Sequence, residues 1–183
     1  VAAGQRWLMA AGIEEHPMSM HLTTQPVDIG ALMAATADPE SGALVVFAGT
    51  VRAHNEGKQV TAINYSAYEP LAEKAIAEIE ARALKEFDIQ RCEIRHRIGD
   101  MAIGDISVVV VVRAAHRGEA FEAGRYGIDT VKHEVAIWKY EEYADGTHEY
   151  VKGCPLNHEH PSNRIHAREH AHVHDHLHEK VAP

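Results

Sequence analysis

The segment from Ile106 to Val112 limits the possible folds more than any other part of the sequence. Its seven residues are apolar and mostly β-branched apart from Ser107. Such residues favour a strand, and an unbroken apolar run is typical of a strand that is covered on both faces. The run is far shorter than the roughly 20 residues that cross a bilayer as a helix. The sequence therefore predicts a buried strand within a layered domain, and no membrane-spanning helix.

Helical and strand patterns alternate on both sides of this strand. Pro70 opens the clearest helix, in the first turn, where its missing N–H costs no hydrogen bond. Apolar residues recur after it at helical spacing: Leu71, Ala75, Ile79, Ala83 and Phe87. Further helices are expected at 27–37 and 117–132, strands at 42–51, 60–67, 91–97 and 106–113, and a hairpin of 136–143 with 148–151. This order predicts an α+β fold, with helices packed against a mixed sheet.

Composition divides the chain into three zones. Residues 26–153 carry the helical and strand patterns and are expected to form the single folded domain. Residues 1–25 have no clear pattern and are expected to be a flexible extension. Residues 154–183 are rich in His and poor in apolar residues, which is typical of a disordered tail.

Charge and cysteine content exclude some classes of protein. The net charge of −9 over 183 residues, with no basic stripe, argues against a nucleic-acid-binding protein, although it allows a local basic pocket. Cys92 and Cys154 are too few for a disulfide framework or a thiolate zinc site. We therefore expect a reduced, cytoplasmic compartment.

Basic side chains stand where predicted elements begin or end. Arg52 follows a strand and could simply be solvated there. Lys132 ends a helix, where the helix dipole favours a cation for purely structural reasons. His116 and Arg117 begin that helix, the unfavourable end for a cation, which gives weak support for a shared anion site with backbone N–H groups. Lys139 follows two apolar residues of a strand, so it either reaches water or is desolvated enough to act as a base or nucleophile.

The His-rich tail is a candidate for weak metal binding, because neutral imidazole binds Zn and Ni. The candidate ligands alternate with other residues: His170, His172, His174, His176 and His178. A physiological metal site is not favoured, since no rigid scaffold is indicated there, and no metal site is expected in the folded domain.

Several short segments, taken in order, resemble the catalytic, large subunit of molybdopterin synthase. Together they span about residues 26–151, in the family's order, and comprise 42–52 (GALVVFAGTVR), 54–57 (HNEG), 65–70 (YSAYEP), 96–99 (HRIG), 115–117 (AHR), 119–123 (EAFEA) and 132–139 (KHEVAIWK). The resemblance implies an α/β hammerhead fold that dimerises through its sheet region. It also implies sulfur transfer from the C-terminal thiocarboxylate of a small ubiquitin-like subunit to cyclic pyranopterin monophosphate. The product would be the dithiolene of molybdopterin, formed without a required cofactor.

The resemblance also implies roles for the residues at the end of the chain's folded part. Lys132 and Lys139 would be the catalytic lysines, and Tyr140 and Glu141 would line the site. Two departures from the family pattern stand close by. Ala136 occupies a position that is commonly proline, and Tyr140 occupies one where a second basic residue often follows the lysine.

Five further positions would bind the substrate, by the same resemblance. Arg52, with Thr50 and Val51 beside it, would bind the phosphate or the pterin. His116 and Arg117 would do likewise, and in the family they reach the pocket from the neighbouring protomer.

Two other functions stay open at the level of sequence. The chain could be a non-catalytic module that binds a ubiquitin-like partner, or a metal-binding protein that acts through its His-rich tail.

Overall fold

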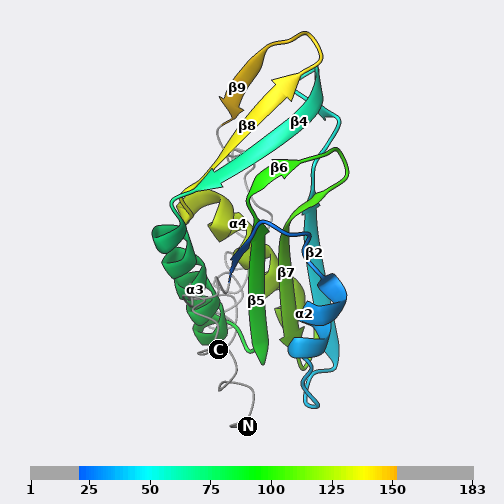
Figure 1. The fold of residues 1–183 in the computed structure, drawn as a ribbon. Helices are drawn as coiled ribbons and strands as arrows, with labels where there is room; N and C mark the ends of the chain where they lie inside the picture. Colours follow the sequence, from blue (N-terminus) through cyan, green and yellow to red (C-terminus); the bar gives the residue numbers. More distant parts are fainter. Residues whose placement is uncertain (1–20, 152–183) are drawn as a thin grey trace, which may run out of the picture. The chain divides into compact units, whose positions relative to one another are not determined.

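A computed structural model describes residues 21–151, and these contain two β-sheets and three α-helices (Figure 1). The sheet with the larger buried core, called the larger sheet below, has four strands in the order β1 (Leu22–Thr23), β5 (Arg91–Arg97), β7 (Ile106–Ala114) and β2 (Ala43–Thr50). β1 runs parallel to β5, and the other neighbours are antiparallel. The apolar run of β7 lies between β5 and β2, and Val109 to Val112 are 0% exposed. The predicted buried strand is therefore confirmed.

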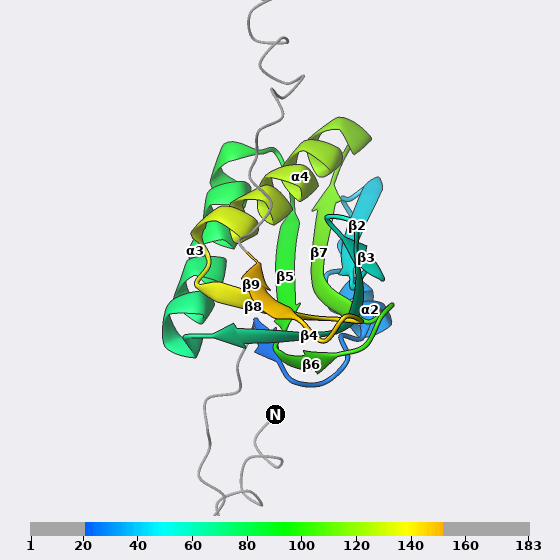
Figure 2. The same ribbon diagram turned by 90° about the horizontal axis from the view of Figure 1, so that it is seen from above.

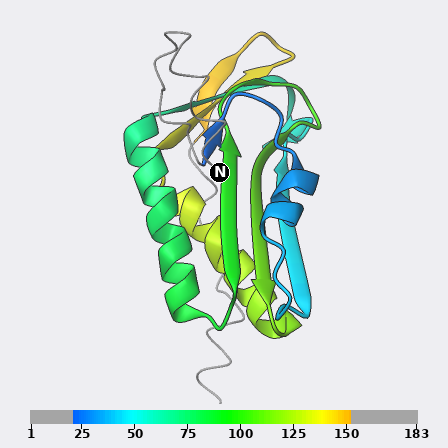
Figure 3. The ribbon, with the colours of Figure 1, turned by 60° about the horizontal axis from the view of Figure 1, so that its bottom comes forward.

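Two long helices cover one face of the larger sheet. They are α3 (Glu69–Glu86) and α4 (Arg117–Glu134), and they pack against a core that includes Val108, Val110 and Val112 of β7. The short helix α2 (Ile29–Ala35) lies on the opposite face, as Figure 3 shows. There the Arg113 guanidinium donates a hydrogen bond of 2.9 Å to the Met33 carbonyl. Because side chains alternate along a strand, Arg113 belongs to the face of β7 that the long helices do not cover.

α4 approaches the sheet closely because two of its residues that face the strands are glycines. A Cβ atom at Gly124 would lie 3.2 Å from Val45 Cγ1, and one at Gly127 would lie 3.1 Å from Val110 Cγ1. Both distances are tighter than ordinary van der Waals contact. The two glycines therefore fix the depth at which α4 rests on β2 and β7.

The apolar face of α3 differs from the predicted one. Its buried residues are Ala72, Ile76, Ile79 and Ala83, whereas Leu71 is 51% exposed. Residues spaced four apart drift around a helix by about 40° per step, because 3.6 residues make one turn. A stripe built only on that spacing, from residue 71 to 87, therefore leaves the buried face at its N-terminal end.

The second sheet has five strands but a smaller buried core, and is called the smaller sheet below; it lies across one end of the larger sheet (Figures 1 and 2). Its order is β3 (His54–Asn55), β4 (Lys58–Ala67), β8 (Ile137–Tyr143) and β9 (His148–Val151), and β6 (Gly99–Met101) also pairs with β4. Val51, Val60, Ile63, Met101 and Tyr143 form its own buried cluster. Glu56 and Gly57, with φ of 48° and 82°, form the two-residue turn between β3 and β4. β4 begins two residues before the strand expected at 60–67, and β3 lies where no strand was expected.

The folded part of the chain begins earlier than the predicted boundary at residue 26. His21 is buried, and Leu22–Thr23 form β1 against β5. This two-residue strand has no periodicity of its own, since the pairing with β5 creates it. The remaining part of the predicted extension, residues 1–20, and the His-rich tail lie outside the described residues. Among the helices between residues 21 and 151, none has the length and apolar character needed to span a membrane.

Candidate functional site

Lys139 forms an ion pair with a buried carboxylate on the inner face of the smaller sheet, which is the face that carries the buried cluster with Tyr143. Its Nζ is 2.7 Å from Glu141 Oε1. The Lys139 side chain is 23% exposed and the Glu141 side chain only 2% exposed. Strand alternation explains the pairing, because residues two apart in β8 point to the same face. The lysine is thus fixed by its inner contact while part of its side chain stays accessible.

Glu141 is held by two hydrogen-bond donors from different strands. The Asn55 Nδ2 group of β3 donates to Glu141 Oε2 at 2.9 Å, and the Tyr143 hydroxyl lies 2.9 Å from the same oxygen. A buried carboxylate is costly unless a cation and hydrogen-bond donors compensate it. The arrangement therefore supports a charged pair of fixed geometry, and it limits the positions that Lys139 can adopt.

Lys132 lies near the C-terminal end of α4, and its side chain is exposed. Only Val135 and Ala136 separate the end of α4 from the start of β8, so Lys132 and Lys139 lie at the same end of the larger sheet (Figure 1). The end of the helix is anchored, because the Arg82 guanidinium of α3 binds both carboxylate oxygens of Glu134.

Arg52 emerges at the junction of the two sheets. It directly follows Val51, whose side chain is 5% exposed within the cluster of the smaller sheet. The Val51 N–H donates to the Asp105 carbonyl, and the Val51 carbonyl accepts from the Gly104 N–H. These contacts give Val51 a structural role, and its contact with substrate stays a prediction. Thr50 and Arg52, on either side of it, are exposed.

His116 and Arg117 lie at the opposite end of α4 from Lys132. Both are exposed, and the His116 side chain makes no capping hydrogen bond. Arg117 and Lys132 are fifteen positions apart along the helix, which corresponds to about 22 Å at 1.5 Å per residue. Within one chain the structure therefore does not bring this pair to the two lysines.

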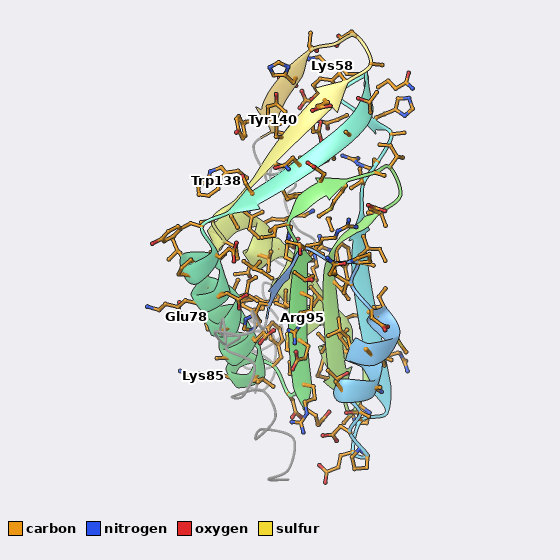
Figure 4. The ribbon with its side chains drawn as sticks, in the orientation of Figure 1. Lys58, Glu78, Lys85, Arg95, Trp138 and Tyr140 are labelled. Carbon is orange, nitrogen blue, oxygen red and sulfur yellow. The ribbon has the colours of Figure 1, made fainter. Side chains whose placement is uncertain are left out.

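Tyr140 lies on the outer face of the smaller sheet, opposite to Lys139 and Glu141. Its ring contacts the rings of Tyr150 and His148, with centroids 5.1 Å and 5.4 Å apart. Trp138, on the same outer face, is 51% exposed (Figure 4). The alternation that places Lys139 inward turns its neighbour Tyr140 away from the site. Within one chain Tyr140 therefore faces away from Lys139, and its role in lining the site stays a prediction.

Sequence reasoning missed three residues around Lys139. Asn55 and Tyr143 hold its partner Glu141, and Tyr65 of β4 stands directly opposite Lys139 in the strand pairing. Tyr143 could have been found, since it continues the alternation of Lys139 and Glu141. Asn55 could not, because 86 positions separate it from Glu141. No group of three His, Cys, Asp or Glu side chains in the described part of the chain could hold a metal ion.

Comparison with known proteins places this site in a family. The model of the MoaE protein family matches residues 22–134. Molybdopterin synthase catalytic subunit 1 of Mycobacterium tuberculosis is 41% identical over 134 residues, which cover 73% of this chain and 90% of that protein. The crystal structure of molybdopterin synthase from Staphylococcus aureus superposes with a TM-score of 0.69 at 32% identity, over 74% of this chain and 98% of the other.

A more distant structural neighbour has the same fold. It is the complex of subunits 1 and 2 of molybdopterin-converting factor from Helicobacter pylori, with a TM-score of 0.58 at 22% identity, over 76% of this chain and 93% of the other. At this identity the likeness shows the fold alone. The family match and the Mycobacterium relative establish more, since the family model matches residues 22–134 and the relative is 41% identical over 73% of this chain. The chain therefore belongs to the MoaE protein family, that of the molybdopterin synthase catalytic subunits.

Proposed function

We propose that this chain is the catalytic subunit of a molybdopterin synthase. In this role it transfers sulfur from the thiocarboxylated C-terminus of a small ubiquitin-like subunit to cyclic pyranopterin monophosphate. The observation that carries the proposal is the ion pair of Lys139 with buried Glu141, found in a chain of this family. Such a pair holds one lysine in a fixed position beside a surface that also carries Lys132.

The chemistry of the reaction requires cations at this place. The thiocarboxylate and the substrate phosphate are both negative, so they repel each other when they approach. Lys132, Lys139 and Arg52 would offset this repulsion, with Arg52 suited to bind a phosphate. A lysine ammonium group can also give its proton to the oxygen that leaves as sulfur adds to carbon. The donor sulfur arrives already activated as a thiocarboxylate, and we propose that the transfer needs no metal or other cofactor.

A second copy of the chain would complete the site. His116 and Arg117 are two exposed basic residues at a helix start, where backbone N–H groups also favour anions. Their distance of about 22 Å along α4 from Lys132 keeps them out of the same chain's site. In a symmetric dimer, each copy could supply this pair to the lysines of its neighbour.

Replacement of the two lysines tests the proposed function. We expect Lys139→Ala and Lys132→Ala each to lower dithiolene formation by about 10²-fold or more, because both charge neutralisation and proton transfer are lost. The assay supplies the thiocarboxylated partner and the precursor, and it detects product after oxidation to a fluorescent derivative. Lys85→Ala removes a lysine from the last turn of α3 and serves as the matched control (Figure 4). Product yields equal to the control for both variants would overturn the proposal.

A further inference from the structure

The Tyr143 hydroxyl lies within hydrogen-bond distance of two carboxylates but has only one hydrogen to donate. The Tyr143 hydroxyl lies 2.9 Å from Glu141 Oε2 and 2.6 Å from Glu149 Oε1. A phenol has a single hydrogen, and an ionised carboxylate can only accept. The hydroxyl can therefore donate to only one of the two carboxylates at a time.

The two carboxylates face each other across neighbouring strands. Glu141 of β8 stands directly opposite Glu149 of β9. Like charges in this position repel, and the Tyr143 hydroxyl between them reduces the repulsion. Each carboxylate also has its own cation: Lys139 lies 2.7 Å from Glu141, and Lys58 lies 3.5 Å from Glu149. The result is a continuous chain of contacts from Lys139 to the surface pair of Glu149 and Lys58.

The surroundings of the Tyr143 ring keep this chain in place. The ring is 4% exposed and packs with Val51, Val60, Ile63 and Met101. Lys58 Nζ lies 4.5 Å from the ring centroid. Burial and the hydrogen bonds to Glu149 and Glu141 raise the pKa of Tyr143, so the phenol keeps its hydrogen at neutral pH. The Tyr143 hydrogen bond, followed by the Lys58 charge, lowers the pKa of Glu149.

We propose that Tyr143 is a positioning residue for Lys139 and that it acts through Glu141. The hydroxyl hydrogen of Tyr143 turns between Glu141 and Glu149. Its direction determines how strongly the charge of Glu141 acts on Lys139. When the hydrogen points to Glu141, that carboxylate holds Lys139 less strongly. When it points to Glu149, the full charge of Glu141 acts on Lys139. The surface pair of Glu149 and Lys58 thereby tunes the readiness of Lys139 to give up its proton.

The charged groups near Tyr143 in the described part of the chain come from three strands. β8 contributes Lys139 and Glu141, and β9 contributes Glu149. β4 contributes Lys58, whose charge is one of the causes that lower the pKa of Asp145 in the β8–β9 turn. β3 contributes the neutral amide of Asn55. The buried cluster that contains the Tyr143 ring consists of hydrophobic residues.

The inference rests on the proposed sulfur transfer, and pH–rate profiles of single turnovers test it. Tyr143→Phe keeps the ring and removes the hydroxyl, so we expect the pH of half-maximal rate to rise by about half a unit or more. Glu149→Gln removes the competing carboxylate and leaves the hydroxyl to Glu141, so the profile moves to lower pH. The double variant behaves like Tyr143→Phe alone. Tyr150→Phe, the same chemical change at an exposed position of β9, leaves the profile unchanged.

The inference is overturned if Tyr143→Phe and Glu149→Gln shift the pH of half-maximal rate in the same direction, or if neither changes it. It is also overturned if the shifts of the single variants add up in the double variant. A thermal melt checks that Tyr143→Phe folds. If that variant is unstable, the surface variant Glu149→Gln still decides by the direction of its shift.

A second measurement needs no activity and separates the inference from the proposed function. In chains labelled with ¹³C at the Glu side-chain carboxyl carbon, we expect the signals of both Glu141 and Glu149 to titrate at higher pH in Tyr143→Phe, because both carboxylates lose the hydroxyl that stabilises their charge. In Tyr150→Phe both signals titrate as in the unaltered chain. If only one signal, or neither, moves in Tyr143→Phe, the inference is contradicted, whereas an inactive chain in which both signals move contradicts only the proposed function.

Discussion

His21 anchors the start of the folded part of the chain to α3, and it makes the stability of the fold depend on pH. Its Nδ1 lies 2.6 Å from Glu73 and its Nε2 lies 3.2 Å from Glu80, so the ring bridges two carboxylates of α3. The hydrogen bond to Glu80 is the main cause that raises the pKa of His21, and Glu73 adds to it against the effect of burial. The protonated ring therefore stabilises the folded chain, with full effect below the unfolded pKa of 6.5.

His21→Gln is expected to remove this dependence. The difference in free energy of unfolding between the original chain and the variant is largest below about pH 6, and it shrinks as the pH rises through the raised pKa of His21. Urea denaturation at a series of pH values measures it. His148→Gln, at an exposed position of β9, is the control. His96 titrates in the opposite sense, because burial lowers its pKa to about 4, but it is the same in both chains and cancels. A difference that does not change with pH contradicts this assignment.

At the same scale, the sequence allowed only part of the site to be predicted. The positions of Lys132 and Lys139 at one end of the larger sheet follow from the short connection between helix and strand. The inward pairing of Lys139 with Glu141 follows from strand alternation, and so does the outward direction of Tyr140, which the resemblance alone did not reveal. The bond from Asn55 to Glu141 could not be predicted, because no local pattern joins residues 86 positions apart.

At the scale of the elements, the distance of helix α4 from the sheet depends on the close contact of Gly127 with β7. We expect Gly127→Val to destabilise the chain by about 1–3 kcal/mol, because Val110 beneath it is fully buried and cannot move aside. Gly118→Val in the first turn of α4 is the matched control, since a Cβ there meets nothing within 4 Å. Urea denaturation compares the two variants. Equal stabilities would mean that α4 can shift away from the sheet at little cost.

The elements that the sequence predicted are those with a strong pattern of their own. β7, α4 and the β8–β9 hairpin carry apolar runs, helical spacing or a clear turn. β1 and β6, of two and three residues, exist only because longer strands pair with them, so no local signal marks them. The buried face of α3 was only partly predicted, since the contact with β5 and α4, and not spacing alone, decides which residues turn inward.

At the scale of the whole molecule, the basic residues of the proposed site lie in two places that are far apart in the fold. Lys132, Lys139 and Arg52 lie toward the smaller sheet, whereas His116 and Arg117 lie at the far end of α4. If each copy completes the site of another, the active unit is at least a dimer. Loss of either the lysines or the pair of His116 and Arg117 should then abolish activity in a preparation that contains one variant alone. Each such variant still carries the group that the other variant lacks.

Mixing two inactive variants tests this central claim most directly. Arg117→Ala and Lys139→Ala are each expected to be inactive alone. After joint refolding in equal amounts, half of the dimers are mixed, and one of the two sites in each mixed dimer has both groups intact. Dithiolene formation should therefore recover to about a quarter of the original chain's rate. A mixture as inactive as its components, although mixed dimers are present, would contradict a site shared between two copies.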